Sequence, residues 1–334
     1  MPASIAGSLE SGDQEPVNVL VVSAPLFALV LLGYLATRSR LIPSEAVQGL
    51  NTYVLYFAMT AMLFRVGAQS SIEELLNPVV IVVWILACWT IIGLGLVPGL
   101  KSGLGWRTSG FAALAGAIPN AGFMGIPLIG AILGQHGLAL LVPILLTDIV
   151  IIQSTGIGLA HIGAGGGGWR ANVKTSLAGV LKNPLMWSIV LGAAWSTTPW
   201  ATPEIIVNFL DLLADSATPV ALFTIGAVLA REQRNARPCV TDTPKVYVGW
   251  LSLLKLLGLP VAAWLFGSLA IAVGAPLTST DLAVLVLTAA LPTAANVPIL
   301  TERFRGDNRI VSTVLLATTA LGFITFNAIA AIVA

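Results

Sequence analysis

Apolar residues in this chain are gathered into runs of roughly 20 that follow one another from Val17 almost to the end. A helix of that length crosses the hydrocarbon core of a bilayer, which is about 30 Å thick. Hydrophobic residues make up 57% of the chain and charged residues 9%, whereas a soluble domain has about 25% charged residues. The sequence therefore predicts an all-α integral membrane protein and excludes a water-soluble fold.

Ten segments are predicted to cross the membrane. They are Val17 to Ala36, Ala46 to Gly67, Pro78 to Leu100, Arg107 to Leu133, Leu138 to Ala160, Leu181 to Trp200, Ile205 to Ala230, Val246 to Ala272, Leu282 to Leu300 and Ile310 to Val333. The second is the most polar, because Gln48, Asn51, Thr52 and Tyr53 lie in its first turns. Such a helix suits a place against protein or a cavity.

Lys and Arg are distributed unevenly between the predicted loops. Of the 16, all except Arg65 and Lys255 lie on one side of the ten-span arrangement. Cytoplasmic loops are enriched in Lys and Arg, so this side is predicted to be cytoplasmic and both termini external. Residues 1–16 contain acidic residues but no Lys or Arg, which is the wrong sign for a signal peptide, and are predicted to form a flexible external tail.

A glycine-rich stretch, residues 161–176, divides the spans five and five and is predicted to be a flexible cytoplasmic linker. The halves are 17–160 and 177–334. Pro25-Leu26 and Leu32-Gly33 recur as Pro184-Leu185 and Leu191-Gly192, and Leu63-Phe64 recurs as Leu222-Phe223, each pair 159 residues later by subtraction. A shared offset indicates duplication, and five spans in each half place the copies in opposite orientations.

The fourth and ninth spans each contain two prolines and an asparagine near mid-membrane. These are Pro119, Asn120 and Pro127 in one, and Pro292, Asn296 and Pro298 in the other. A proline inside a helix removes a backbone hydrogen bond and clashes with the preceding turn, so both spans are predicted to open locally. Interrupted spans at corresponding places in two halves indicate the binding site of a secondary transporter. The alternative is two ordinary kinks whose asparagines bridge helices.

These segments, in this order, resemble the auxin efflux carrier family, which includes bacterial malonate-type carriers and is related to bile-acid/sodium symporter-type folds. The resemblance is carried by Pro25 to Tyr34, Gly49 to Asn51, Pro119 to Pro127, Lys182 to Leu185, Thr218 to Phe223 and Ala290 to Asn296. It implies ten transmembrane helices in two inverted five-helix repeats, with broken helices four and nine crossing. Spans 1, 2, 6 and 7 would form a scaffold, and spans 3–5 and 8–10 a core that moves in elevator-type alternating access.

Carried over residue by residue, the resemblance implies a substrate site at the crossover, made of Pro119, Asn120, Gly122, Pro127, Pro292, Thr293, Asn296 and Pro298. Ionisable groups within spans are costly and usually have a partner or a role. Lys255 either binds a substrate carboxylate or neutralises Asp148 as a structural pair. Asp148 and Asp215 are the candidates for ion coupling, whereas Asp211 is expected to be solvated near the outer surface. No function is assigned to Arg65, His136 or His161.

The sequence thus predicts a secondary transporter that moves a small organic anion, a malonate- or auxin-like carboxylate, across the plasma (inner) membrane. A passive channel or substrate sensor on the same fold is the alternative. No motif of a zinc enzyme, serine hydrolase or phosphate-binding loop is present, so an enzyme is not expected. No metal, no nucleic acid and no cofactor other than a coupling ion (H+ or Na+) is expected. Membrane lipid is expected to surround the chain, and homodimerisation is left open.

Overall fold

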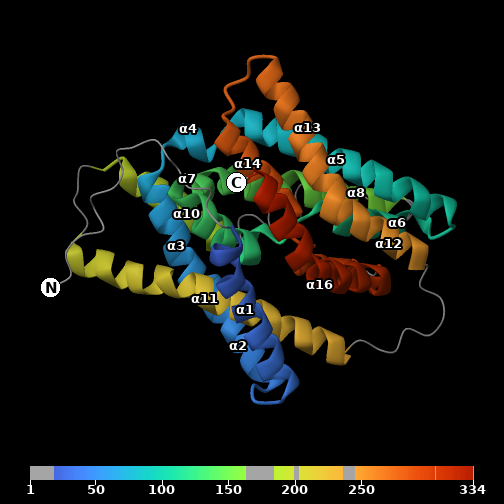
Figure 1. Cartoon of the computed structure of the whole chain (residues 1–334), viewed down its shortest axis with the longest axis horizontal. Helices are drawn as coiled ribbons and strands as arrows, with labels where there is room; N and C mark the ends of the chain where they lie inside the picture. Colours follow the sequence, from blue (N-terminus) through green and yellow to red (C-terminus); the bar gives the residue numbers. More distant parts are fainter. Residues whose placement is uncertain (1–18, 163–183, 199–202, 236–244, 305, 334) are drawn as a thin grey trace.

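The computed structural model describes residues 19–162, 184–198, 203–235, 245–304 and 306–333. The secondary-structure elements in these ranges are helices (Figure 1), which confirms the predicted all-α class. The predicted tail, 1–16, and the predicted linker apart from residues 161 and 162 lie outside the described residues.

The helical elements up to residue 162 include several short π-helical turns. In chain order they are α1 (Val19–Arg38), α2 (Ser44–Tyr53), η1 (Val54–Ala58), α3 (Met59–Gln69), α4 (Ile72–Leu75), α5 (Pro78–Lys101), α6 (Gly105–Ala117), η2 (Ala121–Gly125), α7 (Ile126–Thr147), η3 (Asp148–Ile152) and α8 (Gln153–Ile162). The elements labelled η are π-helical turns.

The described part of the chain from residue 184 onward also contains long helices and one π-helical turn. Its elements are α10 (Pro184–Ser196), α11 (Glu204–Asn235), α12 (Lys245–Leu253), η4 (Leu254–Gly258), α13 (Leu259–Ala272), α14 (Ser279–Ala290), α15 (Asn296–Arg303) and α16 (Asn308–Val333).

Five helical stretches within the described ranges are long and apolar enough to cross a membrane. They are Pro78–Lys101, Ala121–Ala160, Glu204–Arg231, Lys245–Ala272 and Asn308–Val333. Shorter apolar helices are Ala24–Arg38, Pro184–Ser196 and Ser279–Ala290. The chain is therefore a helical protein with several membrane-length segments.

The longest of these stretches turns back on itself at Gly134. This residue has φ +62° and ψ −151°, a backbone conformation that favours glycine. A methyl group on Gly130 would touch the side chain of Leu138 at 3.2 Å, although residues eight apart in a straight helix lie about 12 Å apart. The turn at Gly134 separates the segments predicted as the fourth and fifth spans.

Polar side chains cap the N-termini of helices α5 and α14. Asn77 precedes α5, and its Oδ1 accepts hydrogen bonds from Val79 N (3.0 Å) and Val80 N (3.2 Å). Thr278 precedes α14 and exchanges hydrogen bonds with Asp281, the third residue of that helix. These caps satisfy N–H groups that have no partner within the helix.

Four glycines allow two helix pairs to pack backbone against backbone. In each contact, a Cβ on the glycine would collide with a main-chain carbonyl of the other helix. The contacts between α1 and α11 are Gly33 with Phe223 and Gly226 with Val30; those between α3 and α10 are Gly67 with Ile189 and Gly192 with Phe64. With α2 and η1, these helices form the glycine-packed group, in which α11 passes across α1, α2 and α3 (Figure 1).

The remaining long helices form a second group, α5 to α8 and α12 to α16. In it α5 packs on α6 and α13, and α13 packs on α14 (Figure 1). The two groups meet where Phe27 of α1 lies edge-on to Phe323 of α16, with ring centroids 4.6 Å apart, and where α11 contacts η2 and α7. The second group holds the interrupted helices.

Candidate functional site

Two helices of the second group stop at a proline and cross as short extended segments. α6 ends at Ala117 and α14 ends at Ala290; Ile118 and Leu291, which precede the prolines, have extended backbones with ψ 118° and 150°. A residue before proline is pushed out of the helical region by the proline ring, which explains where both helices end.

The extended segments Ile118–Asn120 and Leu291–Ala294, here called the crossing, satisfy each other's backbone groups. Asn120 N donates to Pro292 O at 2.8 Å, and Ala294 N donates to Ile118 O at 3.0 Å, with Pro119 opposite Thr293. Unpaired backbone groups are costly away from water, so this antiparallel pairing lets both interruptions occur inside the protein.

The second prolines of the two spans lie beyond the interruptions. Pro127 is the second residue of α7, and Pro298 lies in the first turn of α15. Both are buried. Pro298 lies where a missing N–H has no helical acceptor to lose, whereas Pro127 follows the π-helical turn η2 directly, inside a continuous helix that begins at Ala121. The first proline of each pair therefore follows the end of a helix, and the second lies within the helix that comes next.

Thr293 links the crossing to two neighbouring helices by hydrogen bonds. Its hydroxyl donates to Ala115 O at 2.8 Å, and its N–H donates to Thr318 Oγ1 at 3.2 Å. Thr293 and Thr318 are both fully buried. The structure thus places this predicted site residue in the joint between α6, α14 and α16.

The other small and polar residues of the predicted site are less tightly held than Thr293. These are Asn120, Gly122 and Asn296. Asn120 is 6% exposed, and its side chain makes no hydrogen bond with the described residues, although its backbone carbonyl accepts from Met124 N and Gly125 N. Gly122 has no atom within 4 Å of the place where a Cβ would lie, so it borders open space. Asn296 is exposed at the start of α15.

The helix ends at the crossing differ in how they are capped. Neither η2, which continues into α7, nor α15 has a side-chain cap at its N-terminus. At the C-terminus of α14, the wholly buried Lys255 donates from Nζ to Ala289 O at 2.8 Å, and at that of α6 Cys88 Sγ lies 3.7 Å from Ala117 O. A cation stabilises a helix C-terminus, and free N–H groups at a helix N-terminus attract anions.

Asp148 is buried near this cationic end. Its Oδ1 accepts from Trp84 Nε1 at 2.8 Å, while Oδ2 is buried and has no hydrogen-bond partner among the described residues. Asp148 and Lys255 attract each other electrostatically, but each makes its hydrogen bond elsewhere. Asp148 begins η3 and Lys255 lies in η4, and π-helical turns are frequent at functional sites.

The structure places Asp215 apart from this group. Its side chain is 74% exposed on α11, with Oδ1 3.5 Å from Arg65 NH1 of α3. Asp211 Oδ1 lies 3.0 Å from the same nitrogen, so the expectation that Asp211 is merely solvated is wrong. The two aspartates lie one helical turn apart, where like charges repel each other, and the shared Arg65 offsets that repulsion.

A chain with several membrane-length helices and a polar crossing inside one helix group is a multi-pass membrane protein. The profile of the family described as membrane transport protein matches residues 19–163 and 169–329. The chain belongs to this family, and the predicted membership of the auxin efflux carrier family is confirmed.

Curated relatives are similar over most of the chain. A putative malonate transporter of Rhizobium meliloti (strain 1021) is 28% identical over 311 residues, covering 90% of this chain and 91% of the relative. The uncharacterized transporter YfdV of Escherichia coli (strain K12) is 26% identical over 309 residues, covering 90% and 92%. Auxin efflux carrier component 8 of Arabidopsis thaliana is 23% identical over 275 residues, covering 64% and 72%.

Proposed function

We propose that the chain is a secondary transporter that moves a small organic anion across the plasma membrane by alternating access. A short carboxylate is the favoured substrate class, with malonate the first candidate because of the name of one relative. The crossing would bind the carboxylate, and the second helix group would carry it past the glycine-packed group.

The observation that carries this proposal is the pair of uncapped helix N-termini at the crossing. The first N–H groups of a helix have no partner within it, and both η2–α7 and α15 begin at the crossing without a capping side chain. Asn120 adds an amide that makes no hydrogen bond with the described residues, and Gly122, two residues later, borders open space. Free N–H groups, an amide donor and a positive dipole end together suit a carboxylate.

Lys255 and Asp148 are proposed to balance charge during the cycle. The Lys255 ammonium lies one residue from the end of α14, where it would offset the negative charge of a bound anion. A buried carboxylate with one unpaired oxygen is costly when ionised, and a proton relieves that cost. This favours Asp148 as the proton carrier over Asp215, which is exposed and paired with Arg65. Sodium is the alternative coupling ion.

The glycine contacts support the inverted repeat. Adding 159 to Val30, Gly33, Phe64 and Gly67 gives Ile189, Gly192, Phe223 and Gly226. Exchanging the halves therefore converts the contact of Gly33 with Phe223 into that of Gly192 with Phe64, and likewise for the other two. Such reciprocal packing is expected of two copies related by a two-fold axis. It suits a fixed scaffold of spans 1, 2, 6 and 7, with ten spans in all and external termini.

A flux assay on the purified chain in liposomes tests the proposal. We expect saturable uptake of a short carboxylate from a panel of mono- and dicarboxylates, with an imposed pH or sodium gradient changing the rate. A non-saturating flux that substrate on the opposite face does not accelerate would indicate a channel instead. No flux of any carboxylate under pH, sodium and voltage gradients would contradict the proposed function.

A further inference from the structure

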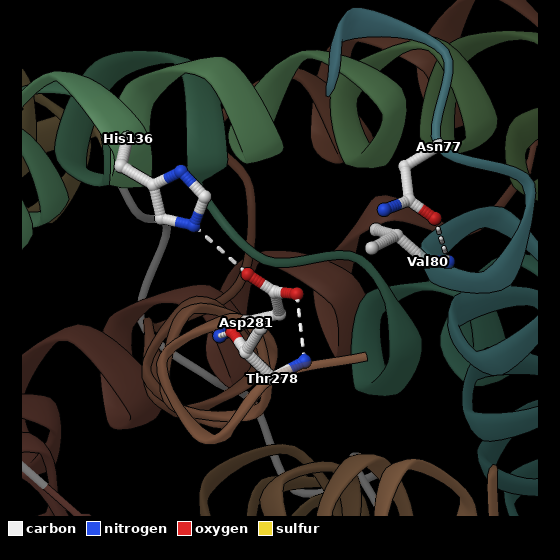
Figure 2. A network of polar contacts seen from close by, with 5 residues as sticks. All are labelled: Asn77, Val80, His136, Thr278 and Asp281. Atoms are coloured by element: carbon white, nitrogen blue, oxygen red, sulfur yellow. Dashed lines mark hydrogen bonds and ion pairs between the residues drawn. The ribbon is translucent and has the colours of Figure 1, made fainter. Parts of the chain in front are cut away.

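One side-chain hydrogen bond joins the two helices that lead into the crossing, at a point away from it. His136, two residues after the turn at Gly134, places Nε2 2.9 Å from Asp281 Oδ1. Asp281 Oδ2 accepts the N–H of Thr278, whose hydroxyl accepts the N–H of Asp281 (Figure 2). One carboxylate therefore caps α14 and binds the α7 turn in the other half of the chain.

The hydrogen bond between His136 and Asp281 lies where it can affect the orientation of the helices at the crossing. α14 runs from Ser279 to Ala290, so Asp281 lies in its first turn and the crossing begins just after its last. η2 and α7 begin directly after Asn120, and His136 lies at the turn that ends their first stretch. α14 is about 18 Å long, so a tilt at the Asp281 end moves the backbone that pairs with Asn120.

The strength of this contact depends on the charge of the histidine. The Asp281 side chain is 7% exposed and that of His136 is 44% exposed, so the carboxylate is largely desolvated while the ring remains reachable from solvent. A charge-assisted hydrogen bond is about twice as strong as a neutral one, and histidine side chains change charge between about pH 5 and 8. Protonation therefore tightens the contact. Among the described side chains, the elements packed on α7 bring other charged groups to the predicted outer side: Glu73 of α4, Arg65 of α3, and Glu204, Asp211 and Asp215 of α11.

We propose that His136 is a positioning residue, which through Asp281 holds α14 at the angle that keeps the crossing paired, more firmly when the outer medium is acidic. The role in transport rests on the proposed function, but the effect on the crossing does not. Asp281 itself is left unchanged in the test, because it also caps α14.

Hydrogen exchange of the full-length protein in lipid nanodiscs, without substrate, tests this inference. The readout is the exchange of the Asn120 and Ala294 amides, which pair across the crossing, after correction for intrinsic rates at pH 5.5 and 7.5. We expect wild-type protection to rise at the lower pH. His136→Leu should speed exchange about tenfold at pH 5.5, the effect of one charge-assisted hydrogen bond.

His136→Gln keeps a donor without titrating, so it should retain most of the protection at pH 7.5 and lose the pH response. His161→Gln, which removes the other histidine, should behave like wild type. Unchanged exchange of both amides in His136→Leu, or a wild-type pH response in His136→Gln, would overturn the inference. If the chain transports no carboxylate, the exchange results still test the role of His136. Failure of the proposed function and failure of this inference are therefore distinguishable.

Discussion

Replacing Lys255 with methionine is expected to reduce carboxylate flux to the level of empty liposomes. The substitution keeps most of the volume of a wholly buried side chain but removes its positive charge and its hydrogen bond to Ala289 O. A hydrogen bond to a charged group contributes about 1.5–3 kcal/mol, and the charge is also the one proposed to offset the bound anion. Lys245→Met is the matched control, because Lys245 is an exposed lysine at the start of α12, directly before the same predicted span.

The double variant Lys255→Met/Asp148→Asn separates the two roles of Lys255. Methionine alone also leaves the buried Asp148 without a nearby opposite charge, and breaking a buried charged pair costs about 3–5 kcal/mol. The double variant should therefore regain thermal stability but not flux, whereas Asp148→Asn alone should lose the response to a pH gradient. If the double variant regains both stability and flux, the pair is structural and Lys255 has no role toward the substrate.

Replacing Asn120 with alanine is expected to weaken carboxylate binding about 5- to 150-fold, the equivalent of about 1–3 kcal/mol, with little loss of thermal stability. The reason is that its amide makes no hydrogen bond with the described residues, so folding does not depend on it. Equilibrium binding to the purified variant measures the affinity.

Asn327→Ala is the matched control for the loss of a buried amide. Asn327 Nδ2 donates to Phe323 O on α16, so alanine there should lower stability and leave affinity unchanged. Equal affinities for wild type and Asn120→Ala would favour the alternative in which the prolines form ordinary kinks.

Much of the fold was predictable because the bilayer imposes strong rules. Apolar runs gave the helices, and the conformational limits around proline explain why α6 and α14 stop before Pro119 and Pro292. The turn at Gly134 also lies between two predicted spans. Each of these features depends on residues close together in the chain.

The partners of the polar side chains were not predictable in the same way, because they come from distant segments. Thr293 bonds to Ala115, which is 178 residues away, and so serves the joint within the crossing. Trp84 was not predicted as the partner of Asp148, although a buried indole N–H needs an acceptor. No function was assigned to His136, because the sequence shows only that it lies at a span end. Its partner Asp281 is 145 residues away, and the sequence does not reveal a contact over that separation.

The most direct measurement of the central claim is substrate protection of a cysteine placed at Gly122. A Cβ at this position meets no described atom within 4 Å, so the side chain should be tolerated, and the position lies two residues after Asn120 in the first turn of η2. The background is Cys88→Ala/Cys239→Ser, which removes both natural thiols, and Gly249→Cys, on α12 and also unobstructed, is the control. We predict that a transported carboxylate slows alkylation of Gly122→Cys in a saturable manner while Gly249→Cys is unaffected. Equal alkylation of Gly122→Cys with and without saturating substrate would contradict binding at the crossing.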